Sequence, residues 1–183
     1  TGDPQYLLAG AQKAAMDLMY TELQNGYIAM HYAQYWSGNS RTDDSRYKLD
    51  EGNNATLWNN MYRISLRNLN DIVQQNSSKL DDPLVATQTA IARITSCWIY
   101  QILADTYGNI PYSSVFQLGN GNITPAYDDA QTVYNHLLDT LQAQIQILDG
   151  LKGTTATGDV IYQGSADKWS KLAHSLMLRL AIR

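Results

Sequence analysis

The sequence is short of the features that mark several common classes of protein. Cysteine occurs once in 183 residues, as Cys97 within an apolar segment, so there is no disulfide framework and we expect a buried structural thiol. Charged residues make up 16% of the chain, against about 25% in an average soluble domain, and the formal net charge is −4. No basic stripe is available to displace counterions from phosphates, which argues against a nucleic-acid partner. No apolar run approaches the ~20 residues of a membrane-spanning helix.

Motifs for catalysis and for metal binding are also missing. The three histidines, His31, His136 and His174, fall in separate segments without a histidine four residues away, so structural or surface roles are favoured over zinc. The acidic residues between positions 43 and 51 lack the glycine that a calcium loop needs at its sixth position, so a solvated loop is favoured over a loose calcium site. We therefore expect no enzyme, no cofactor and no metal site.

The sequence does have a strongly helical pattern. Apolar periodicity predicts an all-α fold of antiparallel helices at 5–24, 55–75, 83–107, 129–149 and 166–182, with residues 37–53 as a long loop. The predicted N-caps are Asn54, Asp82 followed by proline, Asp128 or Asp129, and Ser165. The apolar stripes of these helices carry three tryptophans that we expect in the core, Trp58, Trp98 and Trp169.

The segment "ILADTYGNIPYSSVF", residues 102–116, is a well-marked exit from a helix. Gly108 follows the last apolar turn, where a positive φ angle favours glycine, and Pro111 prevents the helix from resuming. We expect this segment to be scaffold that orients the next helix, and not part of an active site.

Three motifs in order resemble the SusD/RagB family of nutrient-binding outer-membrane lipoproteins of Bacteroidetes. They are "ADTYGNIPYSSVF", then "PAYDDAQTVYNHLLDTLQAQIQIL", then "DVIYQGSADKWSKLAHSLMLRLAIR", and the similarity extends over nearly the whole chain. The last motif has the family's D-x-I-Y-x-G form at Asp159, Ile161, Tyr162 and Gly164. It is followed by a helix that carries Lys168, Trp169, Ala173, Ser175, Leu176, Leu178 and Arg179.

The resemblance implies a fold, a partner and a location. The fold is built on tetratricopeptide-like antiparallel helix pairs with long irregular loops, and residues 1–183 are expected to form a single α-helical domain at the N-terminal part of a longer protein. The function implied is non-enzymatic capture of an extracellular oligosaccharide for a SusC-like TonB-dependent transporter. The protein is expected on the extracellular face of the outer membrane, held there only by an inferred N-terminal lipid anchor. A peptide ligand and a helical-repeat scaffold for protein–protein interaction remain as alternatives.

The candidate ligand site is the aromatic and polar cluster at the end of the first helical region. Aromatic faces stack on sugar rings while planar polar side chains bond the hydroxyls, and the residues that combine these properties are Tyr35, Trp36, Asn39, Arg41, Asp43, Arg46 and Tyr47, with Tyr32 beside them. The alternative is that Tyr32, Tyr35 and Trp36 pack as the end of the first helix and the charges are solvated. Exposure of the rings separates these two interpretations.

Overall fold

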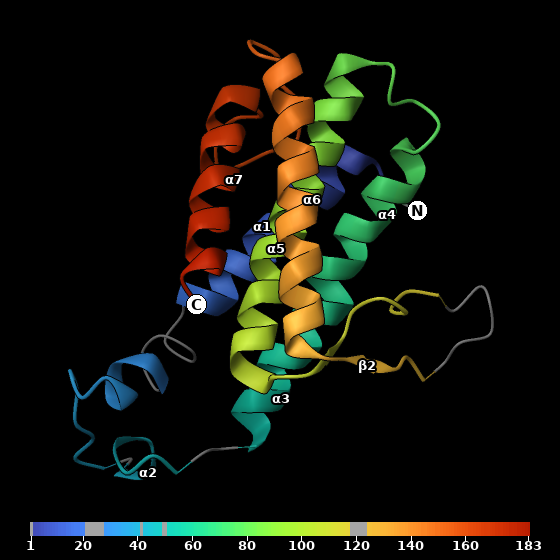
Figure 1. Cartoon of the computed structure of the whole chain (residues 1–183). Coiled ribbons are helices and arrows are strands. Elements are labelled where there is room, and N and C mark those ends of the chain that lie inside the picture. Colours follow the sequence, from blue (N-terminus) through green and yellow to red (C-terminus); the bar gives the residue numbers. More distant parts are fainter. Residues whose placement is uncertain (1, 21–27, 41, 49–50, 118–123) are drawn as a thin grey trace.

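The structure, a computed structural model, describes residues 2–20, 28–40, 42–48, 51–117 and 124–183. Helices pack side by side along most of the molecule, and the segment that carries α2 (Thr42–Ser45) projects from one end of the bundle (Figure 1). Within the described residues, β-structure is limited to two short strands and one isolated bridge between Thr155 and Ser165. The all-α prediction is confirmed.

The first half of the chain differs in detail from the sequence prediction. Helix α1 spans Pro4–Tyr20, and the remainder of the helix predicted at 5–24 lies outside the described residues. The helix predicted at 55–75 is a continuous run made of α3 (Glu51–Asn60), the π-helix η2 (Met61–Leu66) and α4 (Arg67–Asn76). Asn54 is therefore not an N-cap, because it lies inside α3.

The predicted loop at 37–53 is also interrupted by helix. It contains α2 and the first residues of α3. The predicted loop is therefore more regular than its polar composition indicates, and residues 28–32, which precede it, are helical as well.

The second half follows the prediction closely. Helix α5 spans Pro83–Tyr107, α6 spans Ala130–Gly150 and α7 spans Ala166–Ala181. Their N-caps are Asp82, Asp129 and Ser165, whose side chains accept hydrogen bonds from the backbone N–H of the second or third residue of each helix. These bonds lie within a few residues of each other in the chain, which is why local sequence was sufficient to find them.

The exit from α5 has the expected backbone. Gly108 has φ of 76° and ψ of −114°, and its N–H bonds the carbonyl of Ala104. The chain then enters β1 (Ile110–Pro111), which pairs antiparallel with β2 (Tyr127–Asp128) just before α6. The C-terminal end of α5 and the N-terminal end of α6 therefore meet, and the two helices run antiparallel (Figure 1).

One hydrophobic core joins the helices. Helix α5 lies at the centre of the bundle, where it packs against α4, α6 and α7, while α1 covers α4 and η2. The core is mostly leucine, isoleucine and alanine, and Trp169 is buried in it as predicted. Trp98 is half-buried against the core. Among the described residues, no helix combines the length and the apolarity that crossing a membrane would require.

Candidate functional site

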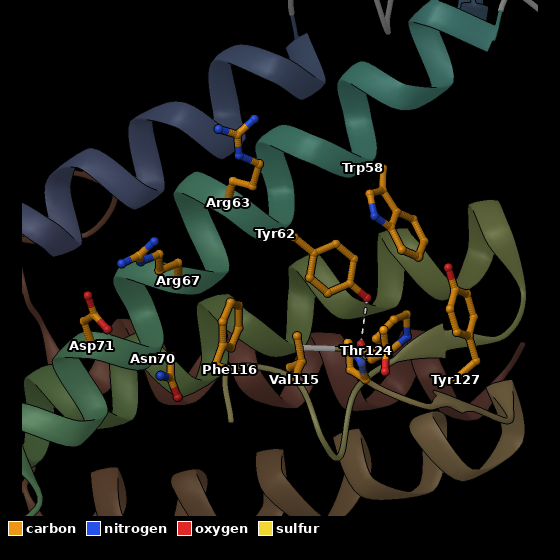
Figure 2. A pocket seen from close by; sticks show the side chains of 12 residues that line it. Trp58, Tyr62, Arg63, Arg67, Asn70, Asp71, Val115, Phe116, Thr124 and Tyr127 are labelled. Carbon is orange, nitrogen blue, oxygen red and sulfur yellow. Dashed lines mark hydrogen bonds between the residues drawn. The ribbon is translucent and has the colours of Figure 1, made fainter. Parts of the chain in front are cut away.

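A cavity of about 710 Å³ opens between the α3–α4 run and the segment that joins α5 to α6 (Figure 2). Its volume falls in the range of about 300–1,000 Å³ that is usual for small-molecule sites. The helical run supplies six of its lining residues, Trp58, Tyr62, Arg63, Arg67, Asn70 and Asp71. The connecting segment supplies the other six, Pro111, Val115, Phe116, Thr124, Pro125 and Tyr127. We refer to this space as the aromatic cavity.

The helical wall of the aromatic cavity follows from the spacing of its residues. Trp58 and Tyr62 are four residues apart, Arg63, Arg67 and Asp71 follow one another at the same interval, and Asn70 lies three residues after Arg67, so the lining forms two neighbouring rows along the run. The opposite set, which includes Leu57, Met61 and Leu69, is buried in the core. The π-helical turn of η2 lies in the middle of this wall, and such turns are frequent at functional sites.

The opposite wall is held in place by Asp128. Its carboxylate accepts hydrogen bonds from the backbone N–H of Tyr112 (3.0 Å) and of Ser113 (2.8 Å), and from the Ser113 hydroxyl (2.7 Å). Burial alone would raise the pKa of Asp128, but these bonds stabilise the carboxylate, and the net effect is a pKa below the usual value. The base of the connecting segment is thereby fixed on β2.

Aromatic rings form a connected array around Trp58. The Trp58 ring lies nearly parallel to that of Tyr127, with centroids 6.0 Å apart and an angle of 18°. It also meets Tyr62 at 4.8 Å and the edge of Tyr107 at 5.0 Å. Tyr127 is 63% exposed, so part of its ring is open to the solvent. An aromatic surface that is fixed and partly bare is what stacking on a sugar ring requires.

Tyr62 joins the two walls. Its hydroxyl donates a hydrogen bond of 2.7 Å to the carbonyl of Pro111, which Figure 2 shows as a dashed line. The pKa of Tyr62 is raised far above its usual value, mainly because the phenol is buried and to a smaller extent because Tyr127 and Asp128 are nearby. The phenol is therefore neutral and acts as a permanent donor, which makes it a structural link and not an acid or base.

Polar side chains on the helical wall are available to a ligand. Within the described part of the chain, Arg63, Arg67, Asn70 and Asp71 make no side-chain hydrogen bond and no ion pair. All four line the cavity, and in Figure 2 the Arg63 side chain extends from the run in a direction away from the Tyr62 ring. This wall thus combines free guanidinium, amide and carboxylate groups with ring faces. Across the described ranges, no group of histidine, cysteine and acidic side chains is arranged to hold a metal ion.

The cluster chosen from the sequence lies elsewhere, in the segment around α2. Three of its rings are open to solvent: Tyr35 is 77% exposed, Trp36 55% and Tyr47 52%. Asn39 and Arg46 are exposed as well, and Asp43 forms an ion pair of 3.0 Å with Lys48. Arg41 lies outside the described residues. The alternative in which Tyr32, Tyr35 and Trp36 are all buried at the end of the first helix is wrong for Tyr35 and Trp36, while Tyr32 is half-buried.

This loop cluster has internal order of its own. The Tyr47 ring packs against the Tyr32 ring, with centroids 5.2 Å apart. The Tyr47 hydroxyl donates a hydrogen bond of 3.3 Å to the Tyr32 carbonyl and accepts one of 2.8 Å from Gln34 Nε2. Trp36 meets the edge of His31, which is buried. The structure therefore brings Tyr32 and Tyr47 together, while none of the cluster lines the aromatic cavity.

Sequence reasoning missed the residues of the aromatic cavity. Trp58 was assigned to the core, yet it is half-buried and lines the cavity. The segment after Gly108 was assigned to scaffold alone, yet Val115 and Phe116 line the cavity too. Little signal for this site was present in the sequence, because Arg63 and Arg67 follow Trp58 and Tyr62 by five positions, and a step of five residues does not bring two side chains onto one face of a regular α-helix.

Comparisons with known proteins agree on one family. The family model SusD-like, described as starch-binding and associating with the outer membrane, matches residues 2–183. A SusD-like structure described as Bacteroidetes AC2a is 24% identical over 98% of this chain, with a TM-score of 0.77. A SusD homologue from Bacteroides ovatus is 26% identical over 96% of the chain, with a TM-score of 0.72. A SusD homologue from Bacteroides uniformis is 27% identical over 97%, with a TM-score of 0.68.

The chain is much shorter than these solved proteins. It covers 33% of the first, 36% of the second and 38% of the third. No match was found among curated protein sequences.

Proposed function

The chain belongs to the SusD-like family, and from that premise we propose that it binds a glycan without altering it chemically. The family is described as starch-binding and associating with the outer membrane, which supports a nutrient-binding role. Because the chain covers about a third of its solved relatives, the activity proposed is that of the protein to which these residues contribute.

The observation that carries the proposal is the aromatic cavity. Trp58 and Tyr127 supply ring faces, and Arg63, Arg67, Asn70 and Asp71 supply donors and acceptors that have no partner among the described residues. Sugar rings present apolar C–H faces and hydroxyl edges at the same time, so they match a wall in which both kinds of group alternate.

The proposal includes a partner and a location. The ligand is an extracellular oligosaccharide that the protein delivers to a SusC-like TonB-dependent transporter at the outer membrane. Association of the family with the outer membrane supports the location. The transporter, the extracellular face and the N-terminal lipid anchor are carried over from the family resemblance.

The loop cluster is proposed as a second contact surface for the same ligand. Trp36 and Tyr47 keep more than half of their surface open, and Tyr35, Asn39, Asp43 and Arg46 of the same segment are exposed as well. Arg41 belongs to the proposed surface by sequence alone. Removing water from one face of an exposed aromatic ring costs little free energy, so such a ring can stack on a sugar.

Tyr127 provides the direct test of the aromatic cavity. Tyr127→Ala removes a ring that is largely exposed, so the free energy of unfolding should change little while affinity for a bound oligosaccharide falls about fivefold, the equivalent of about 1 kcal/mol. Binding is measured by calorimetry with a panel of neutral and acidic linear oligosaccharides. Tyr6→Ala is the matched control, because Tyr6 is 73% exposed on α1. If no oligosaccharide of the panel binds, and peptides bind with an affinity that Tyr127→Ala weakens, the ligand is a peptide and not a glycan.

Trp36 tests the loop cluster separately. Since Trp36 is 55% exposed, Trp36→Ala should leave the melting temperature nearly unchanged, within about 0.5 kcal/mol of stability, and weaken oligosaccharide binding. Unchanged affinity in Trp36→Ala beside reduced affinity in Tyr127→Ala would confine the site to the aromatic cavity. Normal affinity in both variants would favour a helical scaffold that binds a protein partner.

A further inference from the structure

A second cavity of about 400 Å³ adjoins the aromatic cavity. Its walls come from α4, α5 and α6 and from residues 112–117 of the connecting segment. Asn70, Val115 and Phe116 line both cavities, so the two spaces meet along α4 and are divided by the side chains of the connecting segment. Phe116 holds a φ of 62°, a conformation that is uncommon for a bulky residue. We refer to the second space as the polar cavity.

The lining of the polar cavity is rich in neutral hydrogen-bonding groups. Gln74, Gln117 and Thr140 contribute amides and a hydroxyl. Burial raises the pKa of both Tyr100 and Tyr112, so their phenols are neutral. The Cys97 thiol is inert for the same reason, with a pKa raised to about 12 by burial despite the opposing charge of Arg93.

Positive charge is concentrated on the two cavities. Arg63 and Arg67 line the aromatic cavity with Asp71, and Arg93 is the one ionised side chain among the described residues that line the polar cavity. All three arginines are exposed and make no ion pair or side-chain hydrogen bond within the described ranges. The nearby Asp128 is engaged by Tyr112 and Ser113. The lining is thus positive in a chain whose net charge is −4.

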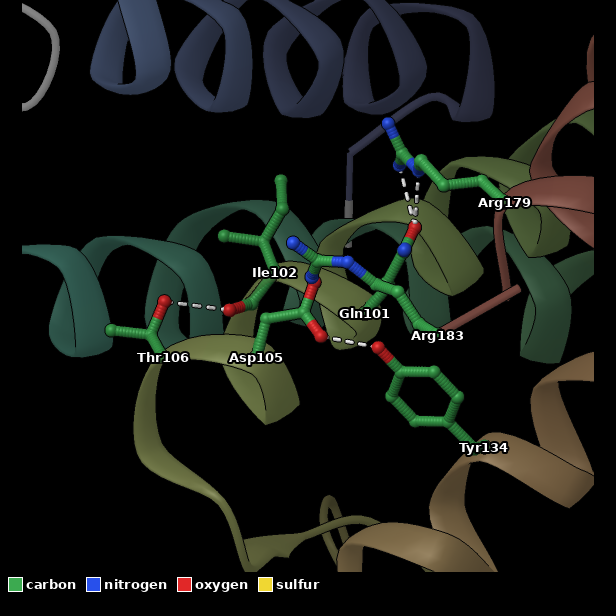
Figure 3. Close-up of polar contacts among 7 residues, drawn as sticks. All are labelled: Gln101, Ile102, Asp105, Thr106, Tyr134, Arg179 and Arg183. Carbon is green, nitrogen blue, oxygen red and sulfur yellow. Dashed lines mark hydrogen bonds and ion pairs between the residues drawn. The ribbon is translucent and has the colours of Figure 1, made fainter. Parts of the chain in front are cut away.

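Arg179 of α7 and Arg183, just beyond the end of that helix, show how a guanidinium with a structural role is bound in this protein (Figure 3). Arg179 donates twice to the Gln101 side-chain carbonyl, through Nε at 2.9 Å and through its terminal nitrogen at 2.5 Å. Arg183 pairs with Asp105, which also accepts from the Tyr134 hydroxyl. Arg63, Arg67 and Arg93 differ from Arg179 and Arg183, because among the described residues no side chain of the protein binds their guanidinium groups.

We propose that the two cavities form one site for a linear acidic glycan, whose carboxylate or sulfate groups pair with Arg67 and Arg63 in the aromatic cavity and with Arg93 in the polar cavity. This inference rests on the proposed glycan-binding function and names its ligand class. The guanidinium fork matches carboxylate and sulfate geometry with two parallel hydrogen bonds. Sugar rings stack on Trp58 and Tyr127, and Asn70, at the junction, offers a donor and an acceptor to the hydroxyls of the unit that crosses it.

The test compares linear hexasaccharides that differ in charge. Hexagalacturonate carries carboxylates, a chondroitin sulfate hexasaccharide carries carboxylates and sulfates, and maltohexaose is neutral. Binding is measured by calorimetry at low and at high salt. At least one acidic probe should bind more tightly than maltohexaose at low salt, with an advantage that shrinks as salt screens the charges. The acidic probe that binds better identifies the anionic group.

Arginine variants locate the charges. Arg67→Gln and Arg93→Gln should each weaken the preferred acidic hexasaccharide about two- to fivefold, as expected for exposed ion pairs, and should weaken it more than they weaken maltohexaose. A disaccharide of the same acidic sugar should respond to Arg67→Gln but not to Arg93→Gln, because it fills the aromatic cavity alone. Lys171→Gln is the matched control, since Lys171 is exposed on α7.

Two results would overturn the inference. Maltohexaose binding as tightly as both acidic probes, with Tyr127→Ala still harmful, would leave the glycan function standing and remove the acidic class. Equal loss of acidic affinity in Lys171→Gln and in the arginine variants would show a general charge effect instead of a site. If no glycan binds and Tyr127→Ala has no effect in any binding measurement, the proposed glycan-binding function itself is wrong.

Discussion

The two connections that flank α6 use their polar groups in opposite ways. In the connection from α6 to α7, residues 151–165, the polar atoms converge inward on Asp159, which is buried. Its carboxylate accepts five hydrogen bonds of 2.7–3.1 Å, from Gln12 Nε2, Trp169 Nε1 and the backbone N–H groups of Ile161, Tyr162 and Gly164. The connection from α5 to α6 is held near its base by Asp128 and by the hydrogen bond from Tyr62 to Pro111, and its described residues line two cavities.

This difference separates a structural motif from a candidate site. The D-x-I-Y-x-G motif is explained by geometry, because its aspartate and glycine build one closed network that ties the loop to α1 and α7. Groups that are satisfied within the protein have nothing left to offer a ligand. The unpartnered arginines and amide beside the other connection do.

The largest effect on stability is expected from substituting valine for Gly164, which can be compared with the same substitution at Gly108, since both glycines have a φ of 76°. A Cβ on Gly164 would lie 1.8 Å from the carbonyl oxygen of Ala156, whereas a Cβ on Gly108 meets nothing within 4 Å. Gly164→Val should therefore lower the free energy of unfolding by about 4 kcal/mol, from overpacking and the left-handed backbone together, and Gly108→Val by about 1–2 kcal/mol from the backbone alone. Urea denaturation measures both. Equal losses would mean that the close packing at Gly164 is relieved by movement of the loop.

A loss of about 3 kcal/mol is expected for Asp159→Ala, because five donors would lose their common acceptor and several would stay buried. Asp159→Asn should cost less, since the amide keeps one acceptor oxygen. Asp139→Ala, at an exposed position of α6, is the control and should change stability by less than about 0.5 kcal/mol. If Asp159→Ala unfolds at the same urea concentration as wild type, water has replaced the carboxylate and the network is dispensable.

The smallest effect is expected at Asp128, which holds the other connection. Its pKa is lowered from 3.8, so the stabilisation it supplies is complete above that value and is lost as the pH falls through the lower pKa of the folded state. The backbone amide resonances of Tyr112 and Ser113 should therefore titrate with a midpoint below pH 3.8. In Asp128→Asn this titration should disappear. A midpoint at or above 3.8 in the wild type would mean that the hydrogen bonds do not hold the connection in solution.

Much of the fold was predictable because its signals are local. Asp82, Asp129 and Ser165 each bond a backbone N–H within three residues, and Gly108 needs only its own φ angle. Where the signal was not local, prediction was wrong. Asn54 has the chemistry of an N-cap, but the helix begins earlier and the Asn54 carbonyl instead accepts a hydrogen bond from Tyr107, which lies 53 positions further along the chain.

The sequence by itself determined the helical class, the ends of α5, α6 and α7, and the resemblance to a nutrient-binding family, because caps, apolar periodicity and ordered motifs are properties of neighbouring residues. Only the tertiary structure decided which rings line a cavity. Trp58 and Trp169 occupy similar apolar stripes, yet one lines a cavity and the other is 1% exposed. That outcome depends on residues 111–117 and 124–127 lying against the α3–α4 run and on Arg93 of α5 lying beside residues 112–117. Such proximity arises from packing between distant segments, which no local pattern encodes.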